Sequence, residues 1–256
     1  MEITPGIRRI GSTKVNVYII EDAGGVTVID AGLPGYWDEL AAELTAMGRS
    51  LDDVRAVVLT HAHDDHIGFA ERMRAERGVP VRVHAGDAGR ARGEKVPRNE
   101  GGGTVRPWPV ITFLVYAIRR GYVRTTRIRS VETFDDGATL DVPGTPRVIH
   151  VPGHTAGSVA LHVPAQSSIF VGDSFITLNV VSGAIGPQLF PNFNLDNSMA
   201  MASLARYEGL EAGHVLPGHG DPWSGGLAEA VRIARASWPA TGGVDAAEQD
   251  LARAGD

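Results

Sequence analysis

The stretch that decides the fold is VVLTHAHDDHIGFAERM, residues 57–73. It starts as an apolar, β-branched run typical of a buried strand and continues, from residue 66, with the apolar spacing of a helix. At their junction lie three histidines and two aspartates within six residues, although the whole chain has only nine histidines. The cluster is therefore either a polar, solvated turn or the first half of a metal site.

Polar residues also end or follow other strand-like runs. We expect strands at 14–22, 25–30, 54–60, 79–85, 146–152, 158–164, 167–173 and 213–220, a strand pair within 126–142, and helices at 36–48, 66–78, 110–123, 197–209 and 225–237. Asp30, His61, His154, Asp173 and His219 each end or closely follow one of these strands. Side chains at strand ends can converge on a cleft whose base is rigid. This recurrence favours a metal site over a solvated turn.

The histidine cluster can serve two ions. On a strand-to-helix turn, residues two apart can face the same way, so His61 and His63 can bind one ion. Asp65 and His66 begin the next turn and can face a second ion.

Three later residues can complete these two sets of ligands. His154 can join the first set, His219 can join the second, and the carboxylate of Asp173 can bridge both ions. The chain has no cysteine, so the donors are imidazole and carboxylate, which suit Zn²⁺ and also Mn²⁺ or Fe²⁺. We expect two divalent metal ions, with Zn²⁺ preferred, that hold a hydroxide between them at neutral pH.

The same residues carry a family resemblance. The matching segments, in family order over about 14–223, are IDAG at 29–32, THAHDDH at 60–66, PGHTAGS at 152–158, VGD at 171–173 and PGHG at 217–220. The chain resembles the metallo-β-lactamase superfamily. The resemblance implies an α/β fold, a four-layer αββα sandwich of two mixed β-sheets flanked by helices, with the metals at one edge. It also implies that Asp30 stands behind the ligands and orients the metal loop.

Differences from known branches of that family reduce the number of candidate activities. The diiron flavoproteins have Glu where this chain has His63, and the true β-lactamases lack the aspartate at 173 and are exported. Glyoxalase II keeps all seven ligands but adds a helical C-terminal domain, for which the 37 residues after His219 are too few. Acyl-homoserine lactonases usually place a tyrosine after the bridging aspartate, and 174–206 contains none.

The resemblance implies a dinuclear hydrolase of an ester, thioester or lactone of an apolar small molecule, attacked by a metal-bridging hydroxide. Asp65 is then both a ligand and the catalytic residue that steers the proton. One alternative is a mononuclear iron sulfur dioxygenase that acts on persulfides, and another is β-lactam hydrolysis as a minor activity. A non-catalytic binding module is disfavoured because all seven ligand positions are filled.

Aromatic residues in two segments are expected to form the substrate wall. The segments are 98–127, read as an inserted, lid-like stretch, and 174–195. The candidates are Trp108, Phe113, Tyr116, Phe175, Phe190 and Phe193. The alternative is that these side chains pack in the core or in a homodimer interface.

Composition limits the partners. A hydrophobic fraction of 43% and a charged fraction of 21% are those of a globular protein, and we expect one domain over 1–256. A net charge of −6 argues against nucleic acid or an anionic membrane as partner. The partner that the family resemblance implies is a small-molecule substrate. The longest apolar stretch, 109–118, is too short to span a bilayer. The N-terminus has no apolar signal-peptide core, so we expect a cytoplasmic protein.

Overall fold

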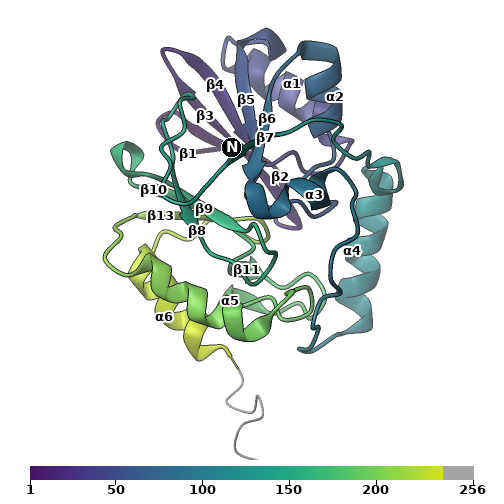
Figure 1. The fold of residues 1–256 in the computed structure, drawn as a ribbon, viewed down its shortest axis with the longest axis vertical. Helices are drawn as coiled ribbons and strands as arrows, with labels where there is room; N and C mark the ends of the chain where they lie inside the picture. The colour runs from purple at the N-terminus through teal and green to yellow at the C-terminus, as the bar shows by residue number, and fades with distance from the viewer. Residues whose placement is uncertain (239–256) are drawn as a thin grey trace, which may run out of the picture.

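The computed structural model describes residues 1–238 as two β-sheets with helices packed on their outer faces (Figure 1). The polar tail after Pro239, expected to fray, lies outside the described residues. Among the described residues, no helix has the length and apolar character needed to cross a membrane.

The first sheet has seven strands in sequential order. They are β1 (Glu2–Thr4), β2 (Ile7–Ser12), β3 (Val15–Asp22), β4 (Gly25–Ile29), β5 (Val54–Val58), β6 (Val81–His84) and β7 (Glu132–Phe134). Strands β1 to β4 pair antiparallel, and β4 to β7 pair parallel. Parallel pairing brings the carboxyl ends of β4 and β5, which precede Asp30 and the histidine cluster, to the same edge.

The second sheet has four strands in the order β13-β10-β9-β8. They are β8 (Arg147–His150), β9 (Val159–Val163), β10 (Ser168–Gly172) and β13 (His214–Pro217). Strands β10 and β13 pair parallel, so the residues that follow them also leave the sheet at one edge. A separate hairpin is formed by β11 (Ile176–Leu178) and β12 (Ile185–Gln188).

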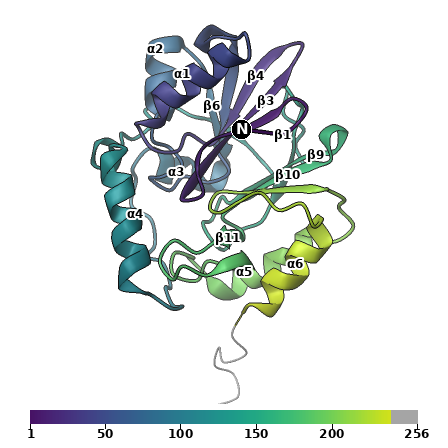
Figure 2. The same ribbon diagram turned by 180° about the vertical axis from the view of Figure 1, so that it is seen from behind.

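Six α-helices complete the described part of the chain. They are α1 (Tyr36–Ala46), α2 (Ala70–Arg77), α3 (Ala88–Ala91), α4 (Pro107–Arg119), α5 (Asn197–Ser203) and α6 (Leu227–Ala236). Short 3₁₀ turns lie at Leu51–Asp53, Ala85–Asp87, Tyr122–Arg124, Pro164–Gln166 and Leu204–Tyr207. Helices α1 and α2 cover the first sheet, and α5 and α6 cover the second (Figure 2).

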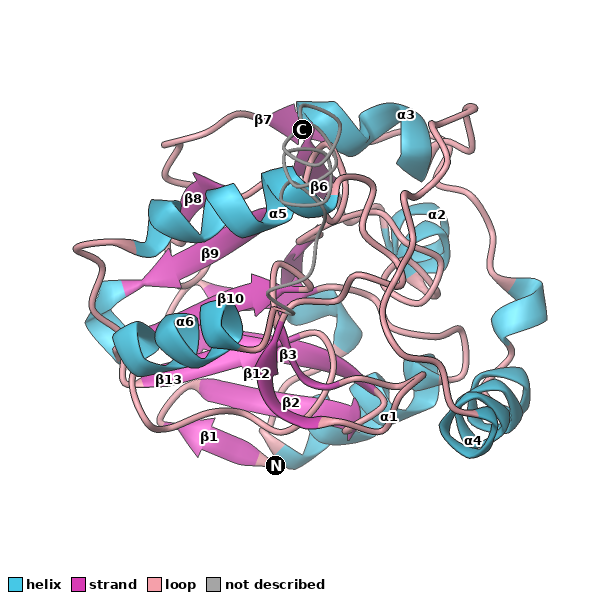
Figure 3. Cartoon of the chain, turned by 90° about the horizontal axis from the view of Figure 1, so that it is seen from below, coloured by secondary structure: helices cyan, strands magenta, loops and turns pink. Residues whose placement is uncertain are grey.

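Three apolar cores hold these layers together. One lies between the two sheets, where Ile20, Val58 and Phe170 meet. The other two lie between each sheet and its own helices; Leu40 is buried in the first and Leu204 in the second. The expected α/β fold of mixed sheets flanked by helices is therefore confirmed. Helix α4 lies at the periphery of this stack (Figure 3), with Ala117 packed in the core of the first sheet.

Several predicted boundaries differ from those observed. Helix α2 begins at Ala70 rather than at residue 66, because the backbone N–H groups of Gly68 and Phe69 donate to the carbonyls of Gly32 and Ala31 instead of starting the helix. Within 126–142 only β7 forms, and Thr139 makes an isolated bridge to Arg147. Strands β1 and β2, which the sequence analysis did not predict, extend the first sheet.

Candidate metal centre

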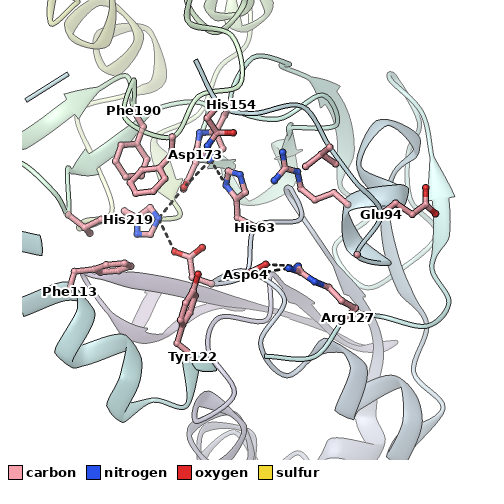
Figure 4. Close-up of a pocket in the computed structure, with 17 residues that line it drawn as sticks. His63, Asp64, Glu94, Phe113, Tyr122, Arg127, His154, Asp173, Phe190 and His219 are labelled. Carbon is pink, nitrogen blue, oxygen red and sulfur yellow. Dashed lines mark hydrogen bonds and ion pairs between the residues drawn. The ribbon is translucent and has the colours of Figure 1, made fainter. Parts of the chain in front are cut away.

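The seven predicted ligands meet at the edge where strands of both sheets end (Figure 4). The loop between β5 and α2 supplies four of them, His61, His63, Asp65 and His66, and the remaining three follow β8, β10 and β13. Four loops from two sheets therefore fix the side chains around one point.

The side chains form the two groups that the sequence predicts. Ligand atoms of His61, His63 and His154 lie within 4.8 Å of one another, and those of Asp65, His66 and His219 do the same. In the first group, His63 Nδ1 and His154 Nε2 are 2.9 Å apart.

Asp173 stands between the two groups. Its Oδ2 lies 3.1 Å from His219 Nε2 and 3.6 Å from His66 Nε2 in one group. In the other group the same oxygen lies 3.5 Å from His154 Nε2 and 3.8 Å from His61 Nε2. A carboxylate in this position can contact an ion on either side.

Buried polar atoms without partners at this point fit a metal. His61 Nε2, His66 Nε2 and Asp173 Oδ1 have no hydrogen-bond partner among the described residues. A buried polar atom without a partner costs about 1–3 kcal/mol, so a folded chain normally satisfies such groups. Bound divalent cations would satisfy the two imidazole nitrogens, and nitrogen and oxygen donors without thiolate are a set that such cations accept.

Four of the histidines are held through the ring nitrogen that faces away from the centre. His61 Nδ1 contacts Thr60 Oγ1 at 3.1 Å, and His66 Nδ1 contacts Asp30 Oδ2 at 2.9 Å. His154 Nδ1 contacts Asn194 Oδ1 at 3.0 Å, and His219 Nδ1 contacts the Lys14 carbonyl oxygen. When Nδ1 donates to an oxygen, the neutral ring keeps the lone pair on Nε2. These contacts therefore leave Nε2 of each ring available to an ion.

Asp30 contacts the ligands from behind. Its Oδ1 accepts from the Thr60 backbone N–H at 2.7 Å, and its Oδ2 accepts from Thr60 Oγ1 at 2.8 Å and from His66 Nδ1. Asp30 could itself form a third ligand group with His61 and His66, but both its oxygens already accept hydrogen bonds. Its backbone has φ +62°, a strained conformation for a non-glycine residue, held by these contacts.

Sequence reasoning missed two residues of this network, Asp87 and Asn194. Asp87 is buried and accepts hydrogen bonds from the Ala62 and Gly157 N–H groups and from Thr155 Oγ1, all at 2.8–2.9 Å. It therefore joins the histidine loop to the loop that carries the histidine after β8. Asp87 also follows a strand, β6, so the strand-end pattern could have found it. Asn194 lies in an irregular loop and shows no such signal.

The electrostatics differ between the two groups of side chains. Burial and the neighbouring imidazoles lower the pKa of His61 and of His63 well below the usual value, so both rings stay neutral. Burial also lowers the pKa of His66, but the carboxylates of Asp173, Asp65 and Asp30 outweigh burial and raise it to about 10. Burial raises the pKa of Asp173, yet the surrounding histidines hold it well below its usual value.

A cavity of about 310 Å³ opens onto the centre. Three of the six predicted substrate aromatics line it: Phe113, Phe190 and Phe193. Phe190 stacks on the His154 ring, with a centroid separation of 6.0 Å and an interplanar angle of 5°. Tyr122 faces the cavity from the opposite side (Figure 4).

The other three predicted aromatics lie outside the cavity. Trp108 is 73% exposed on α4, and the Tyr116 hydroxyl hydrogen-bonds to the Tyr36 hydroxyl at 2.6 Å. Phe175 is fully buried in the core of the second sheet, edge-on to Tyr207. Neighbouring residues of one segment point in different directions, and the sequence alone did not resolve which of them face the cavity.

An ion pair links segment 98–127 to the metal loop. The Arg127 guanidinium donates two hydrogen bonds to the carboxylate of Asp64, which lies between two of the predicted ligands. Both residues line the cavity.

Comparison with known proteins agrees with this geometry. A model of the family described as "Metallo-beta-lactamase superfamily" matches residues 10–219. A probable metallo-hydrolase, YflN, of Bacillus subtilis is 25% identical over 88% of this chain and 87% of that protein. A hydroxyacylglutathione hydrolase of Fuscovulum blasticum is 31% identical over 62% of this chain and 47% of that protein. The crystal structure of TTHA1623 in a di-iron-bound form is 25% identical, with a TM-score of 0.59 over 89% of this chain and 97% of that one.

Proposed function

Since the chain belongs to the metallo-beta-lactamase superfamily, we propose that it is a dinuclear metal-dependent hydrolase of an ester, thioester or lactone of an apolar small molecule. The observation that carries the proposal is the position of Asp173, whose Oδ2 lies within 3.1–3.8 Å of imidazole nitrogens from both ligand groups. A carboxylate shared in this way suits two ions better than one.

In this proposal each ligand group holds one ion. His61, His63 and His154 form the first group, Asp65, His66 and His219 form the second, and Asp173 contacts both. When bound, two such ions supply a hydroxide at neutral pH and polarise a carbonyl oxygen. Zn²⁺ is the ion we propose first, and the di-iron-bound neighbour supports iron as a substitute.

Asp65 is the residue that handles the proton. Both Asp65 and Asp173 line the cavity, but the side chain of Asp65 is partly exposed there, whereas that of Asp173 is buried. Asp65 Oδ2 lies 3.5 Å from His219 Nε2, and its Oδ1 lies 4.0 Å from His66 Nε2. A carboxylate that reaches both the ligands and the cavity can accept a proton from the nucleophile and return it to the leaving group.

The wall of the cavity favours an apolar acyl group. Phe113 and Phe190 both lie beside His219, at centroid distances of 6.3 and 5.5 Å, and Phe193 packs on Phe190. These rings can exclude water from the reacting carbonyl and contact an acyl chain. The hydroxyacylglutathione hydrolase relative supports a thioester as one of the candidate bonds.

The test is a panel assay of the zinc-loaded chain with a pH indicator. The panel holds lactones of several chain lengths, aryl and alkyl esters, acyl-glutathione thioesters and one β-lactam. Turnover of one class, absent without metal, is the expected result and identifies the bond. No turnover of any member, together with oxygen uptake by the iron-loaded chain in the presence of a persulfide, would replace the hydrolase with the sulfur dioxygenase.

A further inference from the structure

Helix α4 presents a row of apolar side chains to the solvent. The exposed members are Trp108, Ile111, Leu114, Val115 and Ile118, at the three- and four-residue spacing of one helix face. The only fully buried side chain of the helix is Ala117. No charged residue stands between Arg106 and Arg119, so the helix is apolar on its outer face as well as on its inner one.

An apolar helix of this kind is normally covered. Helices that are hydrophobic on all sides occur in cores or membranes, and large contiguous apolar patches on a surface mark interaction sites. The helix has 13 residues and is therefore about 20 Å long, too short to cross a hydrocarbon layer of about 30 Å. A surface that covers the helix must therefore lie parallel to the helix axis, because the helix cannot cross a bilayer.

The charges around the helix are of one sign. Residues 101–131 contain six arginines and no aspartate or glutamate, although the whole chain has a net charge of −6. Three of these arginines pair with acidic residues of the body: Arg120 with Glu39, Arg127 with Asp64 and Arg129 with Glu71. The other three, Arg106, Arg119 and Arg124, have no ion-pair partner among the described residues and flank the apolar row.

We propose that the outer face of α4 docks on the surface of an anionic lipid bilayer. The helix would lie in the plane of the interface, with its apolar row in the acyl boundary and the flanking arginines among the headgroups. Trp108, in the first turn and 73% exposed, is the residue type that prefers this depth. The expectation of no membrane partner rested on the net charge of the chain, which conceals this local excess of arginine.

The same charges argue against a second copy of the chain as the occupant. A two-fold contact places the same surface of both chains face to face. The arginines at the ends of α4 would then meet the partner's arginines, and residues 101–131 offer no carboxylate to separate them. Anionic headgroups supply the complementary charge that a second copy lacks.

Docking of α4 on a bilayer also indicates the class of substrate, an inference that rests on the proposed hydrolysis. Phe113, on the inner face of α4, lines the metal-site cavity, as do Tyr122 and Arg127 just beyond the helix. The helix therefore lies between the proposed lipid surface and the cavity. This arrangement suits an amphiphilic acyl ester or thioester that partitions into bilayers.

The test is co-sedimentation of the full chain with vesicles, without any substrate. Vesicles of phosphatidylcholine alone are compared with vesicles of phosphatidylcholine and phosphatidylglycerol at 7:3. We expect binding to the anionic vesicles, weaker binding in high salt, and much weaker binding to the neutral ones. The Asp65→Ala chain should bind as the wild type does, so a failure of hydrolysis leaves this result unaffected.

Matched variants test whether the outer face of α4 carries the binding to vesicles. Leu114→Ser/Ile118→Ser removes two exposed apolar side chains and should weaken binding more than about tenfold, while Ile185→Ser/Met199→Ser, two exposed side chains on β12 and α5, should not change it. Arg119→Gln/Arg124→Gln should weaken binding roughly 25-fold, at about fivefold for each charge. The control Arg55→Gln/Arg147→Gln, on β5 and β8, should have little effect.

Three outcomes would overturn the proposal. The first is no sedimentation with anionic vesicles at low salt. The second is equal binding by the α4 variants and the wild type. The third is a wild-type dimer in sedimentation velocity that Leu114→Ser/Ile118→Ser converts to a monomer, which would make the face an interface between copies.

Discussion

The metal centre and segment 98–127 face each other across one cavity but are held in different ways. At the centre, each of four imidazoles has a hydrogen bond behind it, and Asp30 and Asp87 tie separate loops together. Helix α4, by contrast, has one fully buried side chain and polar links such as Tyr116 to Tyr36 and Lys14 Nζ to Thr112 Oγ1. The candidate metal centre is built into an edge held by buried hydrogen bonds, whereas helix α4 on the opposite wall buries one side chain and leaves its outer face exposed.

The largest effect is expected from Asp65→Ala. Loss of a ligand that also handles the proton should reduce turnover by about 10²–10⁴-fold, with little change in thermal stability because Asp65 is partly exposed. Initial rates with the best substrate of the panel and a thermal melt check this. The matched control is its neighbour Asp64→Ala, which removes only the ion pair with Arg127. An Asp65→Ala chain that keeps most of its activity contradicts the role.

Two substitutions of phenylalanine distinguish a position in the core from a position in the cavity wall. Phe175→Ala should lower the free energy of unfolding by about 3–5 kcal/mol, because it empties a fully buried site. Phe193→Ala, at a side chain 37% exposed in the cavity, should change stability by less than about 1 kcal/mol and raise KM. Urea denaturation and steady-state kinetics measure the two effects. Equal loss of stability in both variants would contradict this division.

Asp30→Asn should weaken metal binding by about 10–100-fold. An amide at this position can accept only through one atom, so it cannot hold the Thr60 N–H, the Thr60 hydroxyl and His66 Nδ1 together. Competition with a fluorescent chelator gives the affinity, and Asp38→Asn on the exposed surface of α1 is the control. Unchanged affinity would show that Asp30 supports the loop backbone alone.

The smallest effect is a dependence of metal affinity on pH. The pKa of His66, about 10 in the metal-free chain, lies above the ordinary value of 6.5. Protonated His66 therefore stabilises the metal-free fold fully below about pH 6.5, and this contribution is lost as the pH rises through about 10. An ion needs the neutral ring, so loading at pH 8 should release at least one proton per chain, and affinity should rise by about tenfold per pH unit. Zinc titration in weak buffer with an indicator measures both; affinity that is constant from pH 7 to 9 contradicts the assignment.

The two regions also differ in how well the sequence predicts them. The ligands could be found because His61, Asp173 and His219 follow apolar strands, and parallel pairing brings such ends together. Trp108, Tyr116 and Phe175 were placed by residue type and segment alone, and the direction of each side chain depends on packing between elements distant in sequence. Tyr116 turns inward because Tyr36 of α1 offers a hydroxyl. Strand β2, which places charged Arg8 and Arg9 between its isoleucines, lacks the apolar run that revealed the other strands.

The most direct test of the two-ion site is the metal content of the chain, measured by mass spectrometry after zinc reconstitution and gel filtration. The arrangement of the two ligand groups around Asp173 predicts two ions per wild-type chain and fewer in an Asp173→Ala chain. One ion per chain in the wild type, unchanged in Asp173→Ala, would contradict the shared carboxylate and with it the dinuclear hydrolase.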